Sequence, residues 1–204
     1  MSEPMERRFR IPQRIEVREI GDNTQIVGHA SVFFDGSEET QFRLDEDFVE
    51  RVDKKAFNGA LARGDDVRAL FNHNPESVLG RSTSGTLRLR VDRVGLRFEI
   101  DLPGTTVGRD VAQLIERGDI TGSSFGFRVT DQDFRTEDGM DIRTIRGVEL
   151  FDVGPVTFPA YDGTDVGLRH VIPDDLKQAR KRYHREAQFQ RLESRRLDRS
   201  PTRR

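Results

Sequence analysis

The segment Gly122-Ser123-Ser124-Phe125-Gly126 contains two serines, either of which is a candidate nucleophile. The segment fits the G-x-S-x-G pattern that displays a reactive serine in many hydrolases. In α/β-hydrolases, however, that pattern follows a strand and precedes a helix. Here the order is inverted, because the sequence predicts a helix before the segment and a strand after it. Taken alone, the segment is therefore typical of a turn that ends a helix.

A serine nucleophile needs a neighbouring base, and the chain has four histidines, His29, His73, His170 and His184. His73 is the best placed, because it follows the short apolar run 67–71 in a loop rich in Asn and Pro. Loops at strand ends are common positions for reactive groups. His29 falls in a predicted strand, and the other two lie in or near a basic C-terminal tail. A lone loop histidine is still more often structural than catalytic.

Two acids, Glu149 and Asp152, interrupt the otherwise apolar segment 148–160. An unpaired charge is costly to bury, so each acid needs a partner. An arginine would serve, and so would a histidine, because a carboxylate that orients a histidine belongs to catalytic triads. Residues three apart face opposite sides of an ideal strand, so we expect only one of the two acids to point at His73.

Other chemistries find little support in the sequence. The chain has no cysteine, which excludes thiolate catalysis and disulfides. No H-E-x-x-H motif or histidine pair at i, i+4 is present, so we predict no metal and no cofactor. The glycines of 104–108 lack the lysine of a phosphate-binding loop. No apolar run reaches about 18 residues, and the first 13 residues have no apolar core, so neither a membrane helix nor a secretory signal is expected.

Charge is distributed unevenly along the 204 residues, whose net charge is −2. Residues 174–204 contain 11 Lys/Arg and 5 Asp/Glu, which leaves 23 basic and 31 acidic residues before them. We therefore expect one domain over residues 1–170 and a basic tail, helical or disordered, over 171–204. Such a tail is usually a solvated arm and sometimes binds an acidic partner. Nucleic-acid binding would depend on the tail alone, so no specific nucleic acid is predicted.

The hydrophobic pattern predicts short strands with two helices. The helices are 52–62, with Asp53 as N-cap, and 108–117, closed by Gly118. The predicted strands are 8–17, 25–34, 125–134 and 141–158, with a hairpin over 85–102. Strands and helices do not alternate as βαβα, so a doubly wound parallel sheet is not expected. The fold class we predict is α+β, mainly β, with an antiparallel, barrel-like sheet and a few helices.

Several segments between Gly28 and Ala160 together resemble the prohead (capsid maturation) serine proteases of tailed phages. They are GHASVF, DKKAF, FNHNPESVLGR, SGTLRLRVDRVGLRFEIDLP, RGDITGSSFGFRV and VELFDVGPVTFPAY. Each motif is short, but their order and spacing are specific. The resemblance implies a β-barrel-like fold related to herpesvirus assembly proteases.

The resemblance also implies a catalytic serine in SFGF and a histidine in FNHN, which are Ser124 and His73. It places the acid at Asp152, where family members often have glutamate, and Glu149 stays open as an alternative. Peptide hydrolysis through an acyl-enzyme would follow. The oxyanion needs hydrogen-bond donors, and the candidates are the backbone N–H groups of Phe125 and Gly126 and the side chains of Arg81 and Arg128.

By the same resemblance, the substrates are the scaffolding segment of the major capsid protein and the protease itself. Cleavage would take place in the host bacterial cytoplasm inside the assembling procapsid, with self-association of the protease as a further expectation and no membrane partner. Two other functions compete with this one. The first is a non-catalytic capsid-assembly or scaffolding module on the same fold, and the second is an unrelated esterase of small substrates.

Overall fold

The computed structural model describes residues 6–10, 15–21, 23–158 and 174–197. The chain divides into two compact units, Met1–Val166 and Gly167–Arg204. The described part of the second unit is one helix, α3 (Asp174–Leu197). None of the helices in these ranges is long and apolar enough to cross a membrane.

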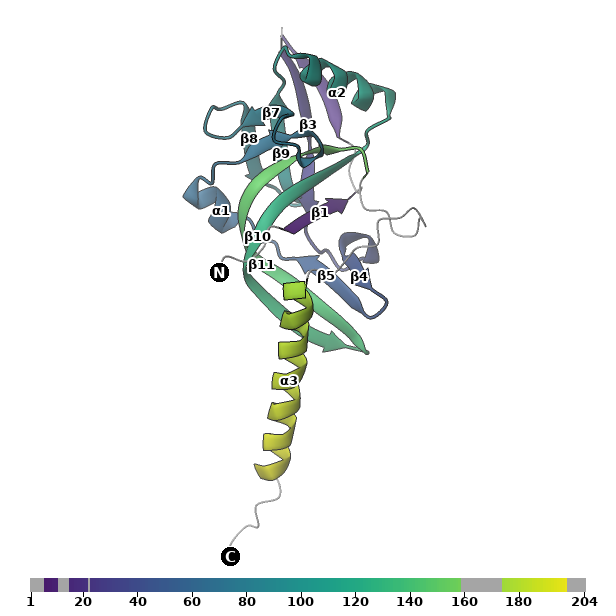
Figure 1. The fold of residues 1–204 in the computed structure, drawn as a ribbon, viewed down its shortest axis with the longest axis vertical. Coiled ribbons are helices and arrows are strands. Elements are labelled where there is room, and N and C mark those ends of the chain that lie inside the picture. The colour runs from purple at the N-terminus through teal and green to yellow at the C-terminus, as the bar shows by residue number, and fades with distance from the viewer. Residues whose placement is uncertain (1–5, 11–14, 22, 159–173, 198–204) are drawn as a thin grey trace, which may run out of the picture. The chain divides into compact units, whose positions relative to one another are not determined.

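The larger sheet of the first unit is built around a long, bent hairpin, β10–β11 (Figure 1). Its main path runs in the order β1 (Glu6–Arg10), β10 (Gly122–Glu137), β11 (Met140–Val156), β5 (Phe48–Val52) and β4 (Phe42–Asp45). A branch from β11 holds β6 (Arg68–Leu70) and β7 (Val78–Arg81). β11 is antiparallel to β10 but parallel to both β5 and β6.

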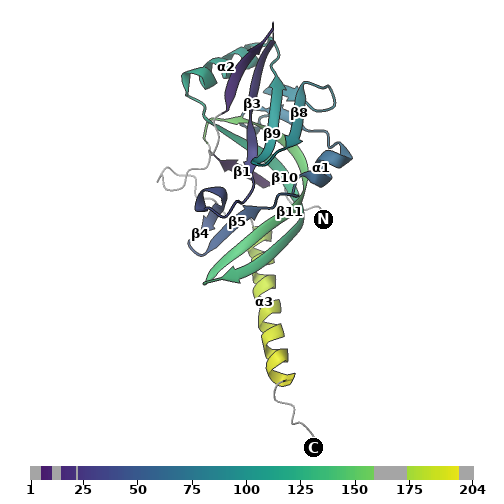
Figure 2. The ribbon, with the colours of Figure 1, turned by 180° about the vertical axis from the view of Figure 1, so that it is seen from behind.

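The smaller sheet is antiparallel throughout. Its order is β2 (Glu16–Ile20), β3 (Asn23–Val32), β9 (Gly95–Asp101) and β8 (Leu87–Val91), as Figure 2 shows from behind. The predicted 85–102 hairpin is confirmed as β8–β9, with Val91 opposite Leu96. Its alternating apolar residues face the core as the period-two pattern predicts.

The mainly β character with few helices is confirmed, but the barrel-like closure is wrong for the part of the chain that the structure describes. The strands form two separate sheets, and the larger one includes parallel pairs. The predicted strand 8–17 is also two strands, β1 and β2, which belong to different sheets. Alternation along one strand shows which face is buried, but it says nothing about which strands pair, and that is why closure was not predictable.

The first helix is shorter than predicted. Val52 ends β5, and α1 spans only Asn58–Arg63. Asp53 is not its N-cap, because that side chain accepts a hydrogen bond from the Lys55 backbone N–H (2.8 Å) in the preceding turn. The sequence pattern misses the start because Asp favours turns as well as helix caps.

The second helix, α2 (Thr106–Arg117), is close to the prediction. It begins two residues early, because the Thr105 side chain caps it by accepting a hydrogen bond from the Gly108 backbone N–H (3.2 Å). Gly118 ends it in the left-handed conformation (φ 82°), as predicted.

Phenylalanine rings fill the core beneath the first half of β10. Phe125 and Phe127 stack with ring centroids 4.5 Å apart, and Phe57 meets Phe125 edge-on at 5.5 Å. Phe33 of the β3–β4 connection lies beyond Phe57, with ring centroids 6.1 Å apart. All four side chains are buried, so the strand that carries the two serines rests on a rigid aromatic layer.

Candidate active site

The two serines lie within a strand and not in a turn, which corrects the sequence prediction. β10 begins at Gly122, so Ser123 and Ser124 point to opposite faces of the sheet. Ser123 shares the core face with Phe125, and its Oγ donates a 2.6 Å hydrogen bond to the backbone carbonyl of His29. Ser124 faces the other way, toward His73.

Ser124, His73 and Asp152 form a continuous line of hydrogen bonds. The Ser124 Oγ lies 2.6 Å from Nε2 of His73, and Nδ1 of His73 hydrogen-bonds a carboxylate oxygen of Asp152. All three side chains are buried. A neutral His73 that donates its Nδ1–H to Asp152 presents the Nε2 lone pair to the Ser124 hydroxyl. The arrangement is that of a nucleophile, a base and an orienting acid.

A β-bulge and a glycine place Asp152 in this line. Gly126 pairs with Asp152, but the next residue, Phe127, pairs with Leu150, so Phe151 is the extra residue of a bulge. A Cβ on Gly126 would lie 2.3 Å from a carboxylate oxygen of Asp152. The carboxylate therefore crosses β10 at a position where only glycine leaves room.

Glu149, the alternative acid, is engaged elsewhere. Its carboxylate forms an ion pair with Arg128, and both side chains are partly exposed. The two acids thus have the two kinds of partner that the sequence suggested, an arginine and a histidine. Of the two, it is Asp152 that the structure brings to His73.

His73 is presented by a short, strained loop. It ends the 3₁₀ turn Phe71–His73 directly after β6, and both Asn72 (φ 54°) and His73 (φ 56°) are left-handed. That conformation is uncommon for residues other than glycine and costs on the order of 1 kcal/mol or more per residue. The two consecutive left-handed residues turn the imidazole back toward β10 and β11.

Asn72 fixes this loop to the end of β11. Its Oδ1 accepts a hydrogen bond from the Thr157 backbone N–H (2.8 Å), and its Nδ2 donates to the Thr157 Oγ1 (3.0 Å). Gly154 allows the close approach, because a Cβ there would lie 2.1 Å from the Leu70 carbonyl oxygen. Sequence reasoning did not assign a role to Asn72 or Gly154. The available signal was the Asn directly before His73 in a loop, because Asn adopts the left-handed conformation more readily than most residues.

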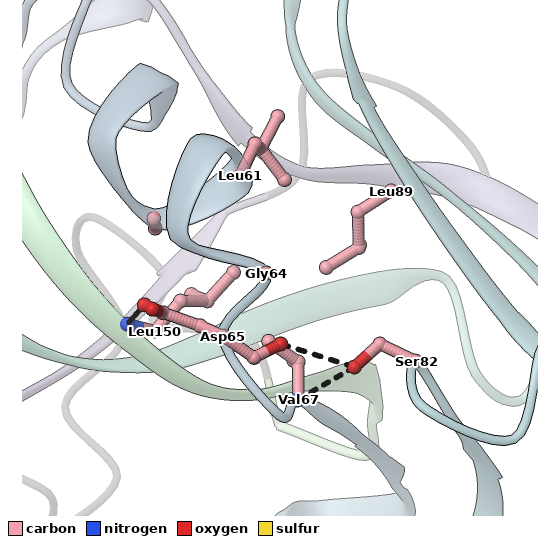
Figure 3. Close-up of a pocket in the computed structure, with 8 residues that line it drawn as sticks. Leu61, Gly64, Asp65, Val67, Ser82, Leu89 and Leu150 are labelled. Carbon is pink, nitrogen blue, oxygen red and sulfur yellow. Dashed lines mark hydrogen bonds between the residues drawn. The ribbon is translucent and has the colours of Figure 1, made fainter.

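The segment that leads into β6 is fixed by partly buried polar contacts around a small pocket (Figure 3). Asp65 accepts a hydrogen bond from the Leu150 backbone N–H (3.0 Å). Ser82 donates to the Asp65 carbonyl (3.1 Å) and accepts from the Val67 N–H (2.9 Å). Since β6 carries the His73 loop, these bonds set the position of the base against β11.

The oxyanion candidates are all engaged in this structure. Phe125 and Gly126 belong to a strand with neighbours on both sides, β1 and β11. Arg81 makes two hydrogen bonds to Asp66 (2.8 and 2.6 Å), and this contact holds the pKa of the Asp66 carboxyl well below its usual range. Arg128 is paired with Glu149, so each of the four candidates would have to leave its present partner before it could bind an oxyanion.

None of the other three histidines is assigned to this line. His29 is buried and its Nε2 lies 2.8 Å from a carboxylate oxygen of Asp92. His184 is in α3, and His170 lies outside the described residues. We therefore treat Ser124, His73 and Asp152 as the candidate active site.

One comparison with known proteins, the match to a family model, agrees with the sequence resemblance. No curated protein matches the chain. Among solved structures, the bacteriophage T4 capsid assembly protease gp21 is similar, with 12% identity and a TM-score of 0.45 over 76% of this chain and 97% of that one. The family model of the caudovirus prohead serine proteases matches residues 13–179. This match covers most of the sequence, and the chain belongs to the caudovirus prohead serine protease family.

Proposed function

We propose that this protein is a serine endopeptidase of phage capsid maturation, with Ser124 as nucleophile, His73 as general base and Asp152 as the acid that orients it. The observation that carries the proposal is the hydrogen-bonded line from Asp152 through His73 to Ser124. Membership of the prohead serine protease family supports the same chemistry.

In the first half of the reaction, Nε2 of His73 takes the hydroxyl proton as the Ser124 Oγ attacks the scissile carbonyl carbon. The tetrahedral intermediate collapses as His73 gives that proton to the leaving amine, and the acyl-enzyme remains. In the second half, His73 takes a proton from water, the hydroxide attacks the acyl carbon, and Ser124 regains its proton. Asp152 keeps Nδ1 protonated and stabilises the imidazolium that forms twice.

The substrates we propose are the scaffolding segment of the major capsid protein and the protease chain itself, cleaved inside the procapsid. The support is membership of the prohead serine protease family, because the name of the family places its members with the prohead. The basic residues of 174–204 offer a contact for an acidic scaffold surface. Self-cleavage that separates this tail from the rest would then release the enzyme from its docking site.

Coexpression with the major capsid protein of the same phage tests this proposal. We expect capsid protein to lose its scaffolding segment with the natural chain and to stay intact with Ser124→Ala or His73→Ala. Ser123→Ala is the matched control, because it removes the neighbouring hydroxyl from the opposite face and should keep cleavage. Cleavage by Ser124→Ala at the natural rate would contradict the proposal. If capsids assemble but the capsid protein stays intact with the natural chain and with every variant, a non-catalytic scaffolding role would be favoured.

A further inference from the structure

The N-terminal strand lies along the edge of β10 that carries the candidate nucleophile. β1 is antiparallel to β10, and it pairs with Ser123–Phe127 and with no other part of β10. Phe9 is the residue opposite Ser124, with Arg10 opposite Ser123 and Arg8 opposite Phe125. β1 is the outermost strand on this side of the sheet among the residues that the structure describes.

This position conflicts with the needs of a peptidase. A substrate peptide has to bring its scissile carbonyl to the Ser124 Oγ, yet Ser124 is fully buried, at 0% exposure. Extended peptides commonly bind by adding a strand to a sheet edge, because the main-chain groups of the edge supply the hydrogen bonds. Along Ser123–Phe127 that edge is already paired.

The same pairing engages the candidate backbone oxyanion donors at Phe125 and Gly126. In an antiparallel pair, alternate residues point their N–H groups at the partner strand, while the residues between them point away. Since β10 has β1 on one side and β11 on the other, the N–H groups around Ser124 that face β1 become available only when β1 leaves. Departure of β1 would thus open both the binding edge and the donors.

We propose that the β10 edge at Ser123–Phe127 is the binding site for the substrate main chain, and that β1 occupies it as an intramolecular competitor. An extended peptide would pair antiparallel to β10 in the place of Glu6–Arg10, with its reactive bond near the position of Phe9. The enzyme is then active only in the fraction of molecules from which β1 has left this edge. This inference rests on the proposed function of Ser124.

β1 is suited to reversible departure. It is five residues long, and its sequence, ERRFR, has four charged residues. Short length and charged side chains are features that limit the pairing of edge strands. Elements that must open for function come from the least stable part of a fold.

The test measures how fast a reporter-tagged fluorophosphonate labels Ser124, because this reagent reacts with activated serines and needs no knowledge of the cleavage site. In the full chain, Arg7→Pro/Arg8→Pro removes two adjacent N–H groups, one of which must face β10 in an antiparallel pair. We expect labelling of this variant to be at least tenfold faster than that of the natural chain. Ser124→Ala in either background should remain unlabelled.

Two controls separate the effect of β1 from general loosening. Arg18→Pro/Glu19→Pro places the same change in β2, which is also five residues long and at the edge of the other sheet. Its labelling rate should match that of the natural chain. A chain lacking residues 1–10 should label as fast as the first variant, and adding the peptide ERRFR should slow it while the reordered peptide RFERR should not. This shortened chain also carries the test if the first proline pair does not fold.

Equal labelling rates at Ser124 in the natural chain and in folded variants without β1 would overturn this inference and leave the proposed function intact. Labelling that persists in Ser124→Ala, or that never occurs at Ser124 in any variant, would instead contradict the proposed function itself. Circular dichroism identifies which variants are folded.

Discussion

At the scale of single residues, the site depends on which of two adjacent serines faces the histidine. Strand alternation gives them different tasks: Ser123 binds the His29 carbonyl within the core, and Ser124 meets His73. Both hydroxyls are buried and hydrogen-bonded, so burial alone does not distinguish a structural serine from a candidate nucleophile. The hydrogen-bond partner distinguishes them, because it is a backbone carbonyl for Ser123 and an imidazole nitrogen for Ser124.

Ser123→Ala should therefore lower stability without abolishing activity. It leaves the His29 carbonyl without the serine hydroxyl, and the loss of a buried hydrogen bond costs about 1–2 kcal/mol. Urea unfolding at equilibrium measures that loss, and fluorophosphonate labelling measures the activity of Ser124. Inactive but fully stable Ser123→Ala protein would show that the two roles have been assigned the wrong way round.

Gly126→Ala should lower activity strongly, because the new Cβ would lie 2.3 Å from an Asp152 carboxylate oxygen. Displacing the acid by about 1 Å lets the imidazole of His73 turn, and misplacement of that size can cost about a hundredfold in kcat. Gly104→Ala is the matched control, because a Cβ at Gly104 meets nothing within 4 Å. Similar kcat values for the two variants would argue that Asp152 does not orient His73.

At the scale of elements, three separate segments meet at the site: β10, the bulged part of β11 and the loop after β6. The loop is the most demanding, because it holds two consecutive left-handed residues at His73 and Asn72. The Asn72–Thr157 hydrogen bonds offset that strain by tying the loop to the end of β11.

Asn72→Gly should separate the conformational task from the hydrogen-bonding task. Glycine adopts the left-handed conformation freely but loses both bonds to Thr157, so we expect kcat to fall about tenfold with a small change in stability. Asn72→Ala loses the bonds and adds backbone strain of about 1 kcal/mol, so it should be less stable than Asn72→Gly. Thr157→Ser keeps both bonds and should retain natural kcat in a peptide cleavage assay. A natural kcat for Asn72→Gly would show that the loop is positioned by other contacts.

Local patterns predicted some of these elements well. The β8–β9 hairpin follows from the alternation of Leu87, Leu89 and Val91, and the end of α2 follows from Gly118. The start of β10 was not predicted, because Gly and Ser favour turns. The pairing of Gly122–Ser124 with β11, and of Ser123 and Ser124 with β1, outweighs that preference.

The candidate site was predictable only through the resemblance to prohead proteases. Along the chain, His73 is 51 residues from Ser124 and 79 residues from Asp152, so no local pattern connects the three. The bulge at Phe151 and the position of β1 beside Ser124 arise from strand pairing, and pairing is a property of the whole sheet. Sequence reasoning therefore named the candidate side chains and missed the strand pairings that surround them.

At the scale of the whole molecule, the acidic first 173 residues and the basic last 31 suggest different tasks. If residues 174–204 dock the enzyme to an acidic scaffold surface, their attraction should be screened by salt. The Debye length falls from about 10 Å at 0.1 M to about 3 Å at 1 M ionic strength.

Copurification of inactive Ser124→Ala protein with capsid protein should thus weaken sharply between 0.1 M and 1 M salt. A chain that lacks residues 174–204 should copurify weakly at either concentration. Densitometry of the eluted proteins gives the bound fraction. Equal recovery at both salt concentrations would contradict electrostatic docking by the tail.

The central claim, that Ser124 and His73 make this chain a self-processing serine protease, is tested most directly by intact-mass spectrometry over time. The natural chain, Ser124→Ala, His73→Ala and the control Ser123→Ala would be purified and incubated in parallel. We predict discrete shortening of the natural chain and of Ser123→Ala, with the other two variants remaining at full length. Equal shortening of all four would contradict the claim, because it would assign the cleavage to a contaminating protease.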